Sequence, residues 1–408
     1  MSAMLSLLRI SWRNLWRNTR RTAITMSALT LGVAVLVGLD SYREATFAQM
    51  LRSVTYGLVG HIQVHGRGYQ ESPEMGTVVQ NPAQVEAAIA HALPGAQPER
   101  RVIGAGLAGA GESSSAVVVM GVQPERSSQM RRIVNGQELT AQARKGVVIG
   151  RGLAEDLGVK VGEELVLVGS AVDGSVANDR YTVVGLAATD SSDLDNHGVF
   201  LQLADAQEFF GLGEAVHQVV VRLPGEERED LTAPLSLLRG ALDLASLEAM
   251  TWSQILPELK GMIESKRQGQ RVVDFIVFLI VALGVLNTAS MAVFERTREL
   301  GVMASLGTRP RRLWGMIVTE AVLQGLLSLA LGVGLAALVL SAIGTVDLTK
   351  LSDQDMMGVR MPDAVLLRLQ AKSVMEAAFT ALFTVVVGSL VPAVRASRLK
   401  PVEAARFV

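Results

Sequence analysis

The chain has 408 residues, of which 49% are hydrophobic and only 19% are charged. Soluble proteins carry about 25% charged residues, so part of this chain is expected to face lipid. The formal net charge of −1 provides no overall field that would attract nucleic acid. The absence of cysteine excludes disulfides and cysteine-ligated metal sites.

Four apolar segments reach the length of roughly 20 residues that a helix needs to cross a bilayer. They lie at 22–42, 272–294, 313–343 and 374–394. The long segment between the first two spans is soluble in character. We therefore expect a membrane protein with four transmembrane α-helices and a large α+β extracytoplasmic (periplasmic) domain between helices 1 and 2.

The basic residues that set the orientation gather in three short segments. The N-terminal segment holds five arginines, the loop after the second span holds five, and the C-terminal tail holds four basic residues. The long segment 43–271 instead carries more acidic than basic residues. Short cytoplasmic segments are rich in Lys and Arg, so both termini are predicted to be cytoplasmic.

The N-terminal stretch LLRISWRNLWRNTRR places Trp12 and Trp16 on one side of a helix and arginines on the other. A basic amphipathic helix with tryptophan lies flat in a membrane interface. We interpret residues 1–21 as such a helix on the cytoplasmic side, leading into an uncleaved first span. The alternative is a basic anchor that only orients that span.

The segment between the first two spans mixes strand and helix patterns. HIQVH, AVVVMGV, ELVLVG, YTVVGLA and QVVVRL are typical of strands. Pro82–Ala92 and Ala204–Phe210 are typical of helices, whereas Gly104–Ser115 and Ser170–Asn178 have the composition of loops. Helical spacing around Met262 predicts a helix that runs unbroken into the second span.

Two polar groups in this segment are candidate metal sites, and both have a simpler explanation. His61 and His65 share one face of a strand, but they are about 13 Å apart along an extended chain. That separation is too large for one zinc ion, whose ligands lie near 2 Å. Asp190, Asp193 and Asp195 do not have EF-hand spacing, so a solvated loop is expected. No metal site is predicted.

Within the third span, Glu320 is a functional candidate because a carboxylate is costly in a membrane. The alternative, which we favour, is a bundle-facing partner for an arginine or a polar group near the cytoplasmic end. Small residues also recur every four positions in this span, and this spacing lets helices approach closely. These residues are Ser328, Gly332 and Ala336, with Ala330 and Gly334 on a second stripe.

The sequence contains no phosphate-binding loop of the form GxxxxGK[ST]. It also lacks a recognisable Ser/His/Asp or paired-carboxylate constellation. We therefore expect that the chain is not an enzyme, that it binds no cofactor, and that any ATP-driven work depends on a partner.

Two stretches on the predicted cytoplasmic side carry a specific pattern. Arg296–Gln324 reads RTRELGVMASLGTRPRRLWGMIVTEAVLQ, and Val391–Val408 reads VPAVRASRLKPVEAARFV. Both resemble the FtsX/MacB/Lol permease superfamily, the type VII ABC transporters. The outer segments GHIQVHGRGY and DSSDLDNHGVFLQLADAQEFF look like those of its lipoprotein-releasing LolC/LolE branch. The long loop 344–373 also favours that branch, since MacB-type members have a short loop there and a fused ATPase.

The resemblance implies a permease that couples ATP hydrolysis by a separate ATPase to periplasmic conformational change, or mechanotransmission. The expected work is extraction of lipoproteins from the outer leaflet of the bacterial inner membrane. The implied partners are an ATPase dimer holding ATP and Mg²⁺, a second permease copy or paralogue, membrane lipid, a lipoprotein substrate and a periplasmic chaperone or adaptor. Nucleic acid is not among them.

The family's coupling helix docks into a groove of the ATPase, and an ordinary basic loop is the alternative for this segment. The residues that match that helix are Arg296, Arg298, Glu299, Leu300, Gly301, Leu306 and Gly307. Substrate is expected to enter laterally beside the first span and the stalks. The residues that we nominate for this route are Leu39, Tyr42, Phe47, Val273 and Ile276.

Two other functions remain open. One is a MacB-like tripartite export permease that works with a periplasmic adaptor, and the other is an FtsX-like signalling complex that controls a cell-wall hydrolase. The predicted order is an amphipathic helix, span and stalk, outer domain, stalk and span, coupling helix, span, loop, span and tail. The corresponding ranges are 1–21, 22–45, 46–265, 266–294, 295–312, 313–343, 344–373, 374–394 and 395–408.

Overall fold

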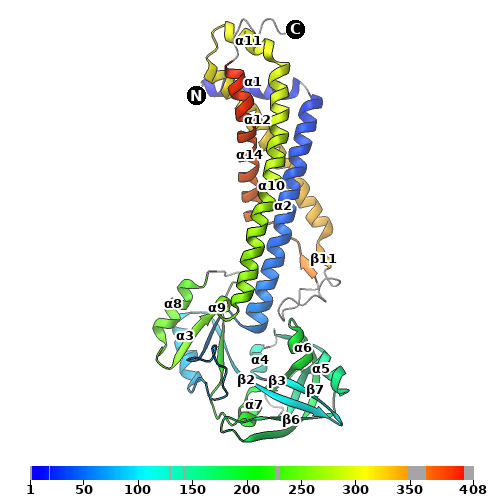
Figure 1. Cartoon of the computed structure of the whole chain (residues 1–408), viewed down its shortest axis with the longest axis vertical. Helices are drawn as coiled ribbons and strands as arrows, with labels where there is room; N and C mark the ends of the chain where they lie inside the picture. The colour runs from blue at the N-terminus through cyan, green and yellow to red at the C-terminus, as the bar shows by residue number, and fades with distance from the viewer. Residues whose placement is uncertain are drawn as a thin grey trace. The chain divides into compact units, whose positions relative to one another are not determined.

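The computed structural model describes residues 2–17, 19–127, 130–140, 144–225, 230–347 and 364–398 (Figure 1). The chain divides into two compact units. The helical unit comprises Met1–Thr46, Ile263–Val346 and Val365–Val408. The sheet unit comprises Phe47–Met262 and Asp347–Ala364. The C-terminal motif beyond residue 398 lies outside the described residues.

Long apolar helices make up most of the helical unit. Over the described ranges, four helices are long and apolar enough to cross a membrane, so the predicted fold class is confirmed. The four are α2 (Thr19–Arg52), α10 (Pro257–Glu295), α12 (Pro310–Ile343) and α14 (Ala371–Ser397). The remaining elements in this part of the chain are α1 (Ser2–Arg17), α11 (Thr297–Ser305), β11 (Thr345–Asp347) and β12 (Ala364–Leu366).

Helices α2 and α12 pack closely through the first stripe of small residues. Ser328 Oγ donates to the Met26 carbonyl at 3.4 Å. Gly332 lies against Val33, and Ala336 is buried in the same apolar cluster. The predicted helix packing is therefore present at these three positions.

The sheet unit is built on one ten-stranded sheet in the order β10-β1-β9-β2-β3-β8-β5-β7-β4, with β6 pairing β2 and β7. Strands far apart in sequence are neighbours, as β1 is paired to both β9 and β10. The strands are β1 (Ile62–Gly66), β2 (Gln97–Ala110), β3 (Ser113–Val122), β4 (Arg131–Gly136), β5 (Gly146–Gly150), β6 (Glu164–Ser170), β7 (Val176–Thr189), β8 (Gly198–Gln202), β9 (Gln218–Arg222) and β10 (Leu247–Thr251).

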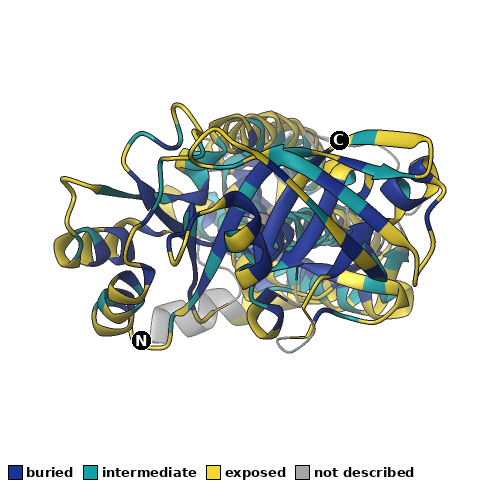
Figure 2. Cartoon of the chain, turned by 90° about the horizontal axis from the view of Figure 1, so that it is seen from below, coloured by how far each residue is buried: buried dark blue, intermediate teal, exposed yellow. Residues whose placement is uncertain are grey.

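Short helices connect these strands and cover the sheet. Figure 2 shows the strands largely in the colour of buried residues and the turns in that of exposed ones. The helical segments are η1 (Ser53–Leu58), α3 (Pro82–Ala92), α4 (Pro124–Ser127), α5 (Arg151–Leu157), α6 (Ser192–His197), α7 (Leu203–Phe210), α8 (Thr232–Ala241) and α9 (Trp252–Ile255).

Most predicted elements of this unit are confirmed. All five strand patterns coincide with strands, namely β1, β3, β6, β7 and β9. Helix α3 has the predicted limits and begins with Pro82, whose fixed φ suits the first turn of a helix. Helix α10 continues without a break through Met262 to Glu295, as expected from its spacing.

The loop predicted for Gly104–Ser115 is wrong, because these residues belong to the β2–β3 hairpin. Gly104 and Gly106 serve close packing and not a turn. A Cβ at Gly104 would lie 2.4 Å from the ring of Phe210, and one at Gly106 would lie 2.8 Å from the Val168 carbonyl. The hairpin turn itself uses Gly111, whose φ is 57°.

The prediction of a solvated acidic loop holds for only part of its range. Asp190 and Asp193 are exposed, but Asp195 is buried in α6. Its carboxylate accepts hydrogen bonds from the Thr189 amide at 2.6 Å and the Thr189 hydroxyl at 2.9 Å. A buried carboxylate needs such donors, so Asp195 is structural.

The two histidines of the first strand pattern have separate roles. His61 Nδ1 accepts from the Leu223 amide at 3.2 Å. His65 Nδ1 lies 3.0 Å from Glu248, its direct cross-strand neighbour on β10. In the described residues, no group of three or more His, Asp or Glu side chains is placed to hold a metal ion.

Candidate functional site

Helix α11 is a nine-residue segment between two long helices, and its ends are encoded locally. Gly307 has a φ of 86°, a left-handed conformation in which glycine is favoured. The Gly307 amide donates to Ala304 at 3.0 Å, and the Thr308 amide donates to Met303 at 3.1 Å. Pro310 then opens α12 at its first turn, where proline is well tolerated.

One face of α11 is buried within the helical unit. Thr297, Leu300 and Gly301 are the buried residues, and the Thr297 hydroxyl donates to the Val293 carbonyl at 3.0 Å. Leu300, which is 2% exposed, lies in an apolar cluster that draws on three of the long helices. The other members of that cluster are Val293, Leu313, Met316 and Ala396, with Met303, Ala304 and Ile317 packed against them.

Arg296 stands between α10 and α11 and joins them to two further helices. Its Nη1 lies 3.0 Å from Glu320 Oε2 on α12, and its Nη2 donates to the Asn14 carbonyl on α1 at 3.1 Å. The side chains of Arg296 and Glu320 are 14% and 11% exposed. Glu320 thus faces the helix bundle with a charged partner, and of the two kinds of partner expected it is an arginine. Breaking such a largely buried pair leaves a charge without its counter-ion.

Helix α1 is also held directly on α12. Ser11 Oγ donates to the Met316 carbonyl at 3.3 Å, and Leu15 beside it is fully buried. At the surface, Arg17 pairs with Glu299 of α11 at 2.6 Å. Exposed ion pairs contribute little, because water and salt screen the charges. The anchoring of α11 therefore rests on its buried face and on Arg296.

A cavity of about 50 Å³ adjoins the Arg296–Glu320 pair. Thr288 and Gln324 are among its polar lining residues, and Val285 and Val385 are among the apolar ones. A cavity of this size has room for water beside the ion pair.

The opposite face of α11 is exposed and partly apolar. Arg298, Val302 and Leu306 recur at intervals of four, so they share one side of the helix. Val302 is exposed and Leu306 is 81% exposed, a high value for a leucine. Gly307 at the end of the helix is exposed too. The family motif does not include Val302. Its spacing of four residues from both Arg298 and Leu306 nevertheless predicts that it shares their side of the helix.

The residues nominated for substrate access fall on both units. Leu39 of α2 and Val273 and Ile276 of α10 have exposed side chains in the helical unit, and Tyr42 is half-buried. Phe47 belongs to the sheet unit and is also half-buried. Exposed apolar side chains on a spanning helix are what contact with lipid requires, so these positions do not by themselves define a binding site.

Two family models match the chain in succession. The MacB-like periplasmic core domain matches residues 22–235, and the FtsX-like permease C-terminal model matches residues 272–401. The first match covers the first span and most of the sheet unit. The second covers the second to fourth spans together with α11.

The individual proteins that match this chain are distant relatives, as their sequence identities show. The chain is 25% identical, over 98% of its length, to the pyoverdine export ATP-binding/permease protein PvdT of Pseudomonas fluorescens, and covers 59% of that protein. It is 23% identical to the lipoprotein-releasing system transmembrane protein LolC of Neisseria meningitidis, over 64% of this chain and 65% of that one. The chain thus spans about three fifths of the length of these curated relatives.

Among solved structures, the chain is similar to the periplasmic region of MacB from Actinobacillus actinomycetemcomitans. That similarity has a TM-score of 0.37 at 11% identity, covering 49% of this chain and 92% of the other.

Proposed function

Because this chain belongs to the FtsX/MacB/Lol-type family of ABC transporter permeases, we propose that it converts ATP hydrolysis by a separate ATPase subunit into movement of its periplasmic domain. It is a multi-pass membrane protein with the MacB-like domain between its first and second spans. In this proposal it lies in a bacterial inner membrane with both termini in the cytoplasm. ATP and Mg²⁺ bind to the ATPase.

The observation that carries the proposal is that α11 has one buried face and one exposed face. One face is fixed to the helical unit by Leu300 and by the Arg296–Glu320 pair. On the other face, Val302 and Leu306 are exposed among the residues that the structure describes. A short helix with an apolar edge and flanking charges suits docking into a groove of a partner protein. We assign that groove to the ATPase.

Movement of α11 would pass into the spans through its rigid attachments. Helix α10 ends at Glu295, two residues before α11 begins, and it is 39 residues long. At 1.5 Å per residue this is a rod of roughly 60 Å. Because Arg296 also binds α1 and α12, a displaced α11 shifts these helices together. In this proposal, these connected helices form the two-state element whose equilibrium is shifted by nucleotide binding.

For the substrate, we propose extraction of lipoproteins from the outer leaflet, which the LolC relative and the long loop 344–373 support. Acyl chains are held by about 0.8 kcal/mol per buried CH₂, so extraction requires an energy source. Export through a periplasmic adaptor is the second candidate. The observation in its favour is that the export relatives align with 98% of the chain.

The test is purification of the permease from native membranes with its co-expressed ATPase, using both active and hydrolysis-deficient ATPase. Mass spectrometry then identifies what is retained. Lipidated proteins trapped with the inactive ATPase would support extraction, whereas a periplasmic adaptor without lipoprotein would support export. A cell-wall hydrolase would support signalling instead. Failure of wild-type permease to retain any ATPase would refute the coupling role itself.

A further inference from the structure

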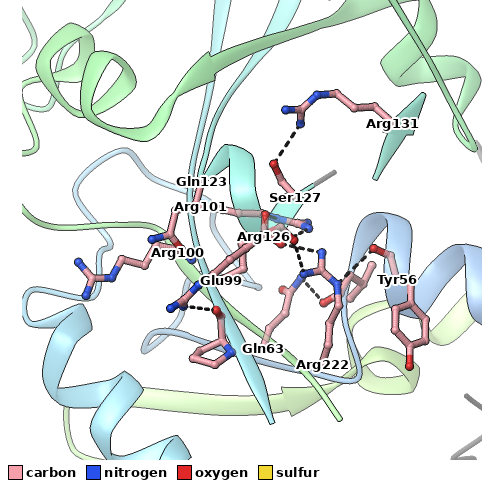
Figure 3. A network of polar contacts seen from close by, with 12 residues as sticks. Tyr56, Gln63, Glu99, Arg100, Arg101, Gln123, Arg126, Ser127, Arg131 and Arg222 are labelled. Atoms are coloured by element: carbon pink, nitrogen blue, oxygen red, sulfur yellow. Dashed lines mark hydrogen bonds and ion pairs between the residues drawn. The ribbon is translucent and has the colours of Figure 1, made fainter. Parts of the chain in front are cut away.

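Three charged side chains are buried together in the sheet unit (Figure 3). Glu99 and Arg101 on β2 are 0% exposed, and Arg222 on β9 is 4% exposed. Arg101 Nε lies 2.9 Å from Glu99 Oε1, and Arg222 Nη2 lies 2.6 Å from Glu99 Oε2. Burial alone would raise the pKa of Glu99, but the two guanidinium groups outweigh it and hold that pKa below its usual value.

The cluster holds two positive charges and one negative charge, so it needs further acceptors. Arg222 finds them on the backbone of two other elements. Its Nε donates to the Tyr56 carbonyl at 3.3 Å, and its Nη1 donates to the Arg126 carbonyl at 3.2 Å. Figure 3 shows the Arg222 guanidinium between these groups and Glu99. One side chain therefore ties together β2, η1 and α4.

Tyr56 belongs to η1, the π-helical segment that continues directly from the first-span helix α2. π-Helical turns are rare and often mark functional positions. The last carbonyls of a helix lack intrahelical donors and carry partial negative charge, so a guanidinium is a fitting cap. Arg222 therefore binds η1, the C-terminal continuation of the helix that leads out of the membrane.

Neighbouring contacts reinforce this joint at the same strand end. The Leu223 amide donates to His61 Nδ1 at 3.2 Å, and the Tyr56 and His61 rings meet edge to face at 5.5 Å. On the other side, Arg126 donates to the Pro98 carbonyl at 2.5 Å, next to Glu99. These contacts thus hold η1, strand β2 and helix α4 together within the sheet unit.

We propose that Arg222 is a positioning residue that transmits movement of the first-span helix to strand β2 and helix α4. This rests on the proposed function, since it names the joint through which the periplasmic domain is moved. A buried ionic triad is often no more stable than apolar residues of the same volume. What the triad provides here is a fixed orientation, because the planar guanidinium donates to two backbone carbonyls while it pairs with Glu99.

The experiment uses the full permease with its ATPase in lipid nanodiscs. Three variants are compared with wild type, namely Arg222→Met, Arg222→Lys and the matched control Arg100→Met. Arg100 also lies on β2, but it pairs with Glu86 and does not bind η1. Lysine keeps the charge of Arg222 but cannot reach Glu99 and both carbonyls at once. The readouts are ATP turnover and hydrogen exchange of α11, η1, β2 and α4 with and without ATP.

The expected result is an uncoupled permease. In both Arg222 variants the ATP-dependent exchange change in α11 persists and ATP turnover stays at the wild-type rate. The ATP-dependent change in β2 and α4 is lost, whereas Arg100→Met retains it. The proposal is overturned if Arg222→Lys keeps that change, or if it lowers turnover and protection throughout the sheet unit, as a purely structural role would. The proposed function itself fails separately, when wild type shows no ATP-dependent change in α11.

Discussion

Gly332 of α12 lies directly against Val33 of α2, where a Cβ on the glycine would come within 2.7 Å of the valine Cβ. The same atom would lie 2.8 Å from the Thr30 carbonyl. Backbone atoms cannot move aside as a flexible side chain can. The two spans are therefore in contact at a point that admits only glycine.

Gly332→Ala is accordingly expected to destabilise the helical unit by about 1–3 kcal/mol, the usual cost of overpacking. Gly334, two residues along, has open space where a Cβ would lie. Gly334→Ala is the matched control, and it should leave the thermal unfolding midpoint of the detergent-solubilised permease unchanged or slightly higher. Equal midpoints for the two variants would contradict the α2–α12 contact.

The Arg296–Glu320 pair predicts a non-additive mutant cycle. Arg296→Met or Glu320→Met alone should cost about 3–5 kcal/mol, since each removes the counter-ion of a largely buried charge. The double variant Arg296→Met/Glu320→Met should be more stable than Arg296→Met. Thermal unfolding of the four proteins gives the coupling free energy. Additive losses would mean that the two side chains do not interact.

The two leucines of α11 should separate stability from partner binding. Leu300→Ala empties a buried site and is expected to cost about 2–5 kcal/mol of stability. Leu306→Asp alters an exposed side chain and should leave thermal unfolding unchanged, while the amount of co-purified ATPase falls. Retention of the ATPase at the wild-type level by Leu306→Asp would place the docking surface elsewhere.

The hydrogen bonds and burial of His217 predict that the sheet unit loses stability as the pH falls. Its Nδ1 accepts from the Ile103 amide at 3.1 Å, and its Nε2 donates to the Met75 carbonyl at 3.1 Å. A protonated imidazole cannot accept, and burial lowers the pKa of His217. The neighbouring Tyr69 stays neutral, because burial raises its pKa to about 12.

Because the folded pKa of His217 lies below the unfolded value of about 6.5, the unfolded chain takes up protons first as the pH falls. Stability is therefore complete above about pH 6.5 and declines below it. Hydrogen exchange of peptides around Ile103, corrected for the intrinsic rate, should show increased opening in this range. His217→Gln should weaken the pH dependence, and surface His91→Gln should preserve it. An unaltered profile in His217→Gln would assign the effect to another group, such as buried His65.

The sequence was most informative where the pattern was local. Apolar length marked the spans, and alternation marked strands such as β9. It was misleading at Gly104, where glycine in a strand makes room for the Phe210 ring, and at Asp195, whose donors lie in the preceding strand. The joint at Arg222 could not be anticipated, because its acceptor Tyr56 is 166 positions away. Such contacts depend on which strands become neighbours.

Helix α10 has one further consequence, which concerns rotation. Each turn of a continuous α-helix is tied to the next by hydrogen bonds, so the helix resists twisting as well as bending. From Pro257 to Glu295 there is no break to absorb a rotation. Turning α11 about the axis of α10 would therefore turn the far end of that helix as well. Helix α10 is therefore suited to transmit a rotation about its own axis as well as a displacement.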